Sequence, residues 1–410
     1  MKPFLCKKII QPCVYFKQLF AVADPHPQRL AVLDGLRALA ILYLILFHAF
    51  QLRLYTLPDA DKMQLLAALP WWQQWLAFGD KGVDIFFVLS GFLIASLLFK
   101  EFQQHQRINM PRFLWHRFLR LSPLYYGLIV VFFIQAAPWV ERHFYTVNLI
   151  YLNNILPLSK QYIPWAWSLA VEMQFYVLLM LYIPVFFKLP AKGLQLVILL
   201  FLSCAWRVWL LLQDSQLNMP IIEVYSRPSA DINHYVETLY ISFFTRSGPL
   251  IVGVISAFLV LFHVNFINRF NRHFLQILAL ALLALILFSP FFSVVLPDTV
   301  NLLFHAGHRL IFACAMALII LSYWAKGQAK GVLYALSWSG YSVIAKLSYA
   351  MFLGHLPVLL GLQSLLAHWL NQWSFITGIY LLFALSLPII LLTSVVVHCF
   401  IERPFMALRR

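Results

Sequence analysis

The first long apolar run of the chain holds an acid, a base and an imidazole. Asp34, Arg37 and His48 all lie within residues 33–52. Arg37 and His48 are eleven positions apart, so an α-helix places them within roughly 20° of one azimuth and about 16 Å apart along its axis. An ionisable residue at membrane depth costs about 2.5 to 3.5 kcal/mol and is by default a functional-site hypothesis. We predict a polar stripe that faces a cavity; the alternative is a self-neutralised Asp34 and Arg37 pair near the membrane surface.

A carboxyl group in another apolar run could serve this imidazole. Trp165, Ser168, Glu172 and Tyr176 have the spacing that places residues on one face of a helix. In the topology argued below this helix begins on the outer side, so Glu172 lies at about the depth of His48. A carboxylate beside an imidazole orients the ring and raises its basicity, as general-base catalysis requires. The alternative is a surface glutamate bonded to a loop.

An aspartate in the second run needs a partner. Asp84 and Gly91 are seven residues apart and share a helix face. Gly91 would let a neighbouring helix approach closely. Asp84 is costly in lipid unless paired, and Arg37 or His48 is its expected partner. A purely structural pair is an equal alternative.

Histidines also lie in later apolar runs. His355 is expected near mid-membrane, on the same face as Ser348. A lone histidine in a helix is more often a hydrogen-bonded packing residue than a catalyst. His305 and His308 are one helical turn apart, but no third ligand is visible, so we predict no metal site.

Basic and aromatic residues alternate over residues 112–126, which include Arg117 and Arg120. Guanidinium groups supply forked donors for phosphate, and aromatic rings supply stacking surfaces for a base. A nucleotide-bearing cofactor such as coenzyme A would use both. On composition alone we favour the alternative, a juxtamembrane segment that holds anionic lipid headgroups.

These residues belong to a chain that is too apolar for a water-soluble protein. Of its 410 residues 62% are hydrophobic and only 11% are charged, and the mean hydropathy is +0.80. Ten apolar runs are long enough to cross a bilayer. We therefore predict an all-α, polytopic transmembrane helix bundle of about ten spans. The runs are 33–52, 82–99, 122–140, 165–187, 194–212, 241–262, 274–295, 303–324, 347–367 and 376–400.

The distribution of charge predicts the orientation. Twenty of the 30 Lys and Arg residues lie in the two terminal segments and in the loops on their side of the membrane, whereas nine of the 15 acidic residues lie in the opposite loops. By the positive-inside rule both termini are cytoplasmic. Arg37 then lies toward the cytoplasm and His48 toward the outside, which suits a reaction across the membrane.

The same argument divides the chain into three parts. Residues 1–30 are expected to form a basic cytoplasmic tail able to lie in the interface, 31–406 a transmembrane domain, and 407–410 a cytoplasmic end. The outer segment 213–240 is interpreted as a solvated connector or, alternatively, as an acceptor-binding loop. The five cysteines contain no C-x-x-C pattern and support neither a disulfide framework nor a zinc site.

Five motifs in register resemble the membrane acyltransferase 3 family, whose members acylate hydroxyl groups of extracytoplasmic polysaccharides and related acceptors. The resemblance covers about residues 30–406. The motifs are Arg37-x10-His48, Asp34-Gly35-Leu36-Arg37, Gly82-Val83-Asp84-x-Phe86-Phe87-Val88-Leu89-Ser90-Gly91-Phe92, Arg117-x-x-Arg120-Leu121-x-Pro123-x-Tyr125 and Trp167-Ser168-Leu169-x-x-Glu172. The chain lacks the appended hydrolase-like domain of larger members, so we expect a self-sufficient transmembrane enzyme.

The resemblance implies that acyl-CoA, most commonly acetyl-CoA, approaches from the cytoplasm. Arg37, Arg117 and Arg120 would hold its phosphates, and Tyr125 belongs to the same donor motif. No metal is implied.

The acceptor, an extracytoplasmic glycan or lipid-linked saccharide, would approach from outside. His48 would act as its general base, Glu172 would orient the imidazole, and Asp84 would order Arg37 or line the tunnel. The other candidate cavity residues are Asp34, Ser90, Trp167, Ser168 and His355.

The competing class is a secondary transporter, which also places Asp, Glu, His and Arg at the centre of about ten helices. Such proteins have broken helices in matching halves, and the sequence shows no paired Gly or Pro interruptions at corresponding positions. We therefore prefer an O-acyltransferase of the bacterial cytoplasmic membrane.

Overall fold

The computed structural model describes residues 12–20, 28–134, 144–227, 229–288, 297–327 and 331–409. In these ranges the chain is mostly helical and has no β-strand, only an isolated bridge between Asn271 and Lys326. Nine of the described helices are long and apolar enough to cross a membrane. The all-α, multi-pass fold is therefore confirmed. Most of the predicted tail, residues 1–11 and 21–27, lies outside the described residues, as does Arg410.

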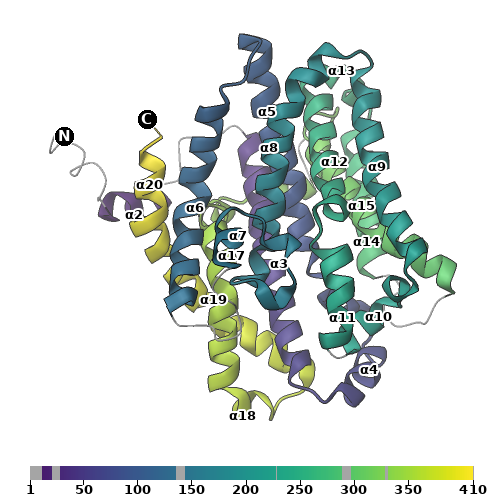
Figure 1. The fold of residues 1–410 in the computed structure, drawn as a ribbon, viewed down its shortest axis with the longest axis vertical. Helices are drawn as coiled ribbons and strands as arrows, with labels where there is room; N and C mark the ends of the chain where they lie inside the picture. The colour runs from purple at the N-terminus through teal and green to yellow at the C-terminus, as the bar shows by residue number, and fades with distance from the viewer. Residues whose placement is uncertain are drawn as a thin grey trace. The chain divides into compact units, whose positions relative to one another are not determined.

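The chain divides into two compact units. Figure 1 labels the helices along the chain, coloured from the N-terminus to the C-terminus. The terminal unit consists of residues 1–53, 109–137 and 334–410, and the central unit of residues 54–108 and 138–333. Each unit is described by itself below.

In the terminal unit α17 packs along α19, and the π-helical turn η9 and α20 pack against α6. Gly35 lies where α3 meets the backbone of Leu336: a Cβ at Gly35 would be 2.1 Å from the Leu336 oxygen. Glycine is therefore required for this close approach. The helices are α2 (Pro12–Phe20), α3 (Gln28–Tyr55), α6 (Met110–Ile134), α17 (Gly340–Leu365), α18 (Ala367–Leu370), α19 (Phe375–Val397), η9 (His398–Glu402) and α20 (Arg403–Ala407), and α16 (Val332–Leu336) leads into the unit.

In the central unit α5 and α12 form the closest helix pair. A Cβ at Gly91 would be 2.1 Å from the Leu250 oxygen, and one at Gly253 would be 2.3 Å from the Val88 oxygen. The predicted role of Gly91 in close packing is confirmed. The helices are α4 (Asp59–Ala67), η1 (Trp71–Phe78), α5 (Lys81–His105), α7 (Tyr145–Leu149), η3 (Asn153–Ile155), η4 (Leu158–Lys160), η5 (Pro164–Ala166), α8 (Trp167–Lys188), α9 (Lys192–Gln213), η6 (Ser215–Asn218), α10 (Ile221–Ser226), α11 (Ser229–Tyr235), η7 (Val236–Tyr240), α12 (Phe243–Phe262), α13 (Val264–Ile267), α14 (Arg272–Leu287) and α15 (Asp298–Ser322).

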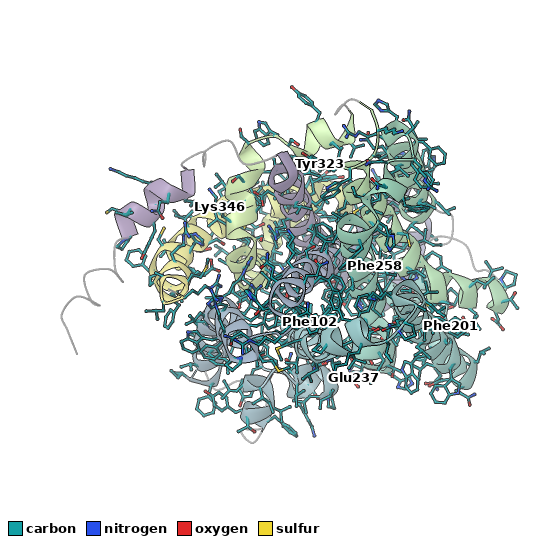
Figure 2. All side chains as sticks on the ribbon, turned by 90° about the horizontal axis from the view of Figure 1, so that it is seen from above. Phe102, Phe201, Glu237, Phe258, Tyr323 and Lys346 are labelled. Carbon is teal, nitrogen blue, oxygen red and sulfur yellow. The ribbon has the colours of Figure 1, made fainter. Side chains whose placement is uncertain are left out.

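The exposed surface of the spans is apolar, as lipid contact requires. On α9, Phe201 is 67% exposed (Figure 2), and on α14 Ile277 is 66% exposed. Exposure of these apolar side chains to water would be unfavourable, so they indicate the lipid-facing sides of their helices.

Residues 100–120 and 213–240, which lie between predicted spans, are mostly helical. The stretch 100–120 consists of the end of α5 and the start of α6. Asn109 accepts the backbone N–H of Arg112 and so caps α6. Arg117 and Arg120 therefore lie on a membrane-span helix rather than in a loop. Long basic side chains can extend from a helix end to the interface, which reconciles their charge with this position. Likewise, 213–240 is mostly short helices.

The tenth predicted span, 274–295, is described only in part. Its helix α14 has 16 residues, which extend about 24 Å, less than the hydrocarbon core of about 30 Å. Residues 289–296 lie outside the described residues. Length alone therefore leaves α14 out of the nine membrane-long helices.

Hydrogen bonds within the terminal unit nevertheless support the predicted crossing by α14. Lys346, near the start of α17, donates to the backbone oxygen of Leu19 in α2 (3.1 Å), and Arg53, at the end of α3, donates to Asn371 beyond α17 (2.9 Å). The entrances of α3 and α17 thus share one side, and their exits share the other. Seven of the nine membrane-long helices lie between the start of α3 and the end of α15. A crossing by α14 as well would give the even number of crossings that this arrangement favours.

Cysteine accessibility tests this topology. Gln104, Gln216 and Gln372 are exposed, so each can be replaced with cysteine in a variant without native cysteines. We expect Gln216→Cys and Gln372→Cys to react with an impermeant thiol reagent in intact cells, and Gln104→Cys to react only after permeabilisation. Labelling of Gln372→Cys in the pattern of Gln104→Cys would mean that α14 does not cross, and a full reversal would invert the predicted orientation.

Candidate functional site

The imidazole of His48 lies at the centre of a polar site in the terminal unit. Its Nδ1 is 2.9 Å from the backbone oxygen of Leu44, one turn earlier on α3. It is also 3.2 Å from Nε2 of His355 on α17, and the two ring centroids are 4.8 Å apart. Nδ1 of His355 is in turn 2.6 Å from the backbone oxygen of Phe352. His355, predicted only as a candidate cavity residue, is therefore the direct neighbour of His48.

These contacts determine where the protons lie. A carbonyl oxygen can only accept, so the two backbone contacts require a proton on Nδ1 of both His48 and His355. Nε2 of His355 then carries a lone pair that accepts from His48 Nδ1–H. The same tautomer places the basic lone pair of His48 on Nε2. A half-buried imidazole held in this way can take a proton through Nε2.

The predicted pair at the start of α3 is present. Arg37 Nη1 donates to Asp34 Oδ1 at 3.3 Å, and each side chain is 22% exposed. Asp34, Arg37 and His48 thus lie on one helix in the order the sequence indicates. The partly exposed guanidinium is a site at which an anion could compete with Asp34.

A cluster of arginines lies on α6 and at the end of α20. Burial, together with the positive charges of Arg120 and Arg117, lowers the pKa of Arg409 to about 10. Nε and Nη2 of Arg409 are buried without a hydrogen-bond partner in the described part of the chain. Like charges gathered in this way indicate a place for an anion. Beside them the rings of Trp115 and Phe118 stack at 5.6 Å.

Tyr125, the fourth residue of the predicted donor motif, has a different environment. It is fully buried, with its ring 5.9 Å from that of Tyr126. Its contact with a donor stays a prediction.

In the central unit, Asp84 belongs to a buried chain of ion pairs. Lys81 donates to Asp80 (2.9 Å), and Asp80 and Asp84 accept from Arg309 (2.5 and 2.8 Å). Arg246 lies 3.0 Å from the other oxygen of Asp84. Burial alone would raise the pKa of Asp80, but Arg309 and Lys81 lower it to about 2.

The expected partner of Asp84 was therefore wrong. Arg37 or His48 was predicted, whereas the structure pairs Asp84 with Arg246 and Arg309. The physical reason is proximity within the unit: α5 packs tightly against α12 through Gly91, and α12 and α15 carry the two arginines.

The guanidinium of Arg246 is surrounded by aromatic rings. It lies 5.6, 5.1 and 5.1 Å from the ring centroids of Phe87, Trp167 and Tyr240. Trp167 was predicted as a candidate cavity residue. In the structure its ring packs on the buried cation of Arg246. Arg246 is 0% exposed, so its charge is balanced inside the protein rather than by solvent.

Glu172 also has a partner in the central unit. Ser90 on α5 donates to Glu172 Oε1 at 2.5 Å, and Tyr176 donates to Ser90 at 3.2 Å. Ser168 is buried at the start of α8. His48 and Glu172 belong to different units, so the action of Glu172 on the imidazole stays a prediction.

Sequence reasoning did not single out Asp80, Lys81, Arg246, Arg309 or Arg409 as site residues. An arginine within an apolar run is itself a signal, and Arg246 could have been found in that way. Arg409 gave no such signal because it follows the last span. Among the described residues no group of three or more His, Cys, Asp or Glu side chains could hold a metal ion.

The order of these polar residues along the helices can be compared with known families. A family model described as "Acyltransferase domain" matches residues 30–395. The chain belongs to this acyltransferase family. The resemblance inferred from the motifs is thereby confirmed.

Three curated relatives illustrate the range of similar proteins. Peptidoglycan O-acetyltransferase OatA of Listeria monocytogenes is 27% identical over 80% of this chain and 49% of its own length. O-acetyltransferase OatA of Staphylococcus aureus is 33% identical over 37% of this chain and 24% of its own length. Nose resistant to fluoxetine protein 6 of Caenorhabditis elegans is 28% identical over 56% of this chain and 31% of its own length. The chain thus spans about half or less of these relatives, and no solved structure matches it.

Proposed function

We propose that this protein is an integral-membrane O-acyltransferase that moves an acyl group, typically acetyl, from cytoplasmic acyl-CoA to a hydroxyl group of an extracytoplasmic glycan or glycolipid. Family membership and the names of the two bacterial relatives support the reaction class. The name of the Listeria relative also supports a cell-wall glycan as acceptor. The apolar helices support an integral-membrane location, which we propose to be the bacterial cytoplasmic membrane. The single observation that carries the proposal is the contact between His48 and His355.

The reaction follows from the tautomer of His48. Nε2 takes the proton of the acceptor hydroxyl as its oxygen attacks the thioester carbonyl carbon. The tetrahedral intermediate then collapses, the carbon–sulfur bond breaks, and the leaving thiolate takes the proton from the imidazolium. The products are an O-acyl ester and CoA. The Nδ1–H of the imidazolium is held by Leu44 and His355 throughout.

The arginine cluster supports a polyanionic donor. Arg117, Arg120 and Arg409 carry like charges close to one another, and a pyrophosphate would offset their repulsion through charge-assisted hydrogen bonds. The stacked rings of Trp115 and Phe118 offer a surface for an adenine base. Arg37, at the cytoplasmic end of α3 in the predicted topology, would complete the donor site.

Binding of CoA tests the donor site directly. We expect Arg120→Ala to weaken acyl-CoA binding by roughly 10- to 150-fold, since charge-assisted hydrogen bonds contribute about 1.5 to 3 kcal/mol. Arg120→Lys should rescue only part of this loss, because lysine lacks the fork. The measurement is calorimetry on purified protein, and Arg112→Ala, an exposed arginine on the same helix, is the matched control. Equal affinities of the Arg120→Ala and Arg112→Ala variants would remove Arg120 from the donor site.

A secondary transporter remains the second candidate, because the buried ion pairs of the central unit also suit a transported ion. A transporter needs no CoA. Absence of CoA binding by the unaltered protein would therefore make the transporter the better proposal.

A further inference from the structure

A groove in the central unit shares no residue with the His48 site or the Asp84 cluster. Its volume is about 670 Å³, within the range of small-molecule sites, about 300 to 1,000 Å³. The walls come from the short helices after α7, from α8, and from η7 with the start of α12. The lining includes Tyr151, Asn154, Met173, Gln174, Glu237 and Phe243.

The groove opens toward lipid. Ile150, Ile155, Leu178 and Phe244 line it and are 63, 67, 51 and 61% exposed. Leu178 is the twelfth of the 22 residues of α8, so it lies about 16 Å along that helix. The groove therefore extends from near the end of a span to mid-membrane depth. Its exposed apolar walls fit a lipid chain. A water-soluble ligand has no such chain to place there.

Polar side chains in the same groove are held in fixed positions. Gln174 Nε2 donates to the Tyr151 backbone oxygen (3.0 Å) and to Asn154 Oδ1 (2.6 Å). Glu237 Oε1 accepts the backbone N–H of Leu158 (2.8 Å). Amide and carboxyl groups are donors and acceptors for hydroxyl groups.

Two backbone irregularities lie at these positions. Tyr151 has φ 59°, a left-handed conformation that is an outlier for a bulky residue. Glu237 belongs to the π-helical turn Val236–Tyr240, and such turns occur frequently at functional sites. Strained backbone persists where surrounding structure holds it, often at ligand sites. Both irregularities therefore mark the polar part of the groove.

We propose that this groove binds an amphipathic glycolipid, with its chain along the apolar wall and its hydroxyl-bearing head at Glu237, Gln174 and Asn154. No Lys, Arg or His is among the described residues that line the groove, so the phosphate of a phospholipid headgroup would find no cation there and would lie near the carboxylate of Glu237. An uncharged saccharide head needs none. That this glycolipid is the acyl acceptor rests on the proposed function.

Photoaffinity labelling of the purified full-length protein in lipid nanodiscs tests the groove. The probe is dodecyl glucoside with a diazirine in its chain, and the competitors are dodecyl maltoside and dodecylphosphocholine. We expect label on peptides covering 150–157, 173–178 and 237–244, displaced by the maltoside but not by an equal concentration of the phosphocholine. Label spread evenly over all lipid-facing helices, or equal displacement by both competitors, would overturn the proposal.

Two variants sharpen this test. Met173→Trp should fill the groove and remove most of the label, whereas Phe201→Trp, on the lipid-facing side of α9 (Figure 2), should leave it unchanged. Glu237→Gln keeps an oxygen for Leu158 N–H, and should weaken labelling by about 2- to 10-fold through the loss of one hydroxyl contact. Equal labelling of Met173→Trp and Phe201→Trp would contradict the site.

The labelling needs no acyl donor, so it separates the groove from the proposed function. Specific labelling of a protein without acyl transfer would support the groove and count against the O-acyltransferase. Acyl transfer without specific labelling would support the O-acyltransferase and count against the groove.

Discussion

Replacing His48 with alanine is expected to lower acyl transfer by at least about 100-fold while the protein still inserts and folds, because a positioned general base contributes typically 10²- to 10⁴-fold. His48 is only half-buried, so its loss leaves a small gap at a partly exposed position rather than a void in the core. Acylation of the acceptor is measured in membranes with matched protein levels. His368→Ala, an exposed histidine on α18, is the control. Retention of more than about a tenth of the activity would contradict the general-base role.

Variants of His355 show whether the neighbouring ring positions His48. Nε2 of His355 accepts from His48 Nδ1–H in the assigned tautomers. His355→Gln can keep an acceptor near this position, whereas His355→Leu cannot. We therefore expect the glutamine variant to retain more activity than the leucine variant, and the leucine variant to shift the acidic limb of the pH–rate profile. A merely structural role would lower protein levels without moving that limb.

The sequence predicted those features that depend on local spacing. The Asp34, Arg37 and His48 stripe required only the helical repeat, and the structure places all three on α3 with the Asp34 and Arg37 pair formed. Gly91 was identified because a glycine in an apolar run marks close packing, and its contact with Leu250 bears this out. Most span positions followed from hydropathy in the same way.

The features that the sequence did not predict depend on distant segments. Asp84 pairs with Arg309, 225 residues away, and periodicity within one helix carries no information on such a partner. His355 and His48 are 307 residues apart, so their contact was equally inaccessible. The lipid-facing groove combines a left-handed Tyr151 with a π-helical turn, and neither has a reliable sequence signature.

Replacing Asp84 with alanine is expected to destabilise the protein by about 3 to 5 kcal/mol, because removing one partner from a buried ion-pair network leaves an uncompensated charge. Asp84 is 0% exposed and lies between Arg246 and Arg309. Without it, two buried guanidinium groups lose their shared carboxylate. The expected result is a lower midpoint of thermal unfolding in detergent and a lower level of folded protein in membranes.

Two further variants identify buried charge as the cause. Asp61→Ala removes an exposed carboxylate of the same unit and should leave the unfolding midpoint unchanged. Asp84→Leu combined with Arg246→Met removes both a carboxylate and a cation, and should be more stable than Asp84→Leu alone, since replacing a buried pair with apolar side chains is often neutral. If Asp84→Ala unfolds at the same temperature as Asp61→Ala, the network does not stabilise the fold. Asp84 would then be better explained by a role in the reaction, as the resemblance first implied.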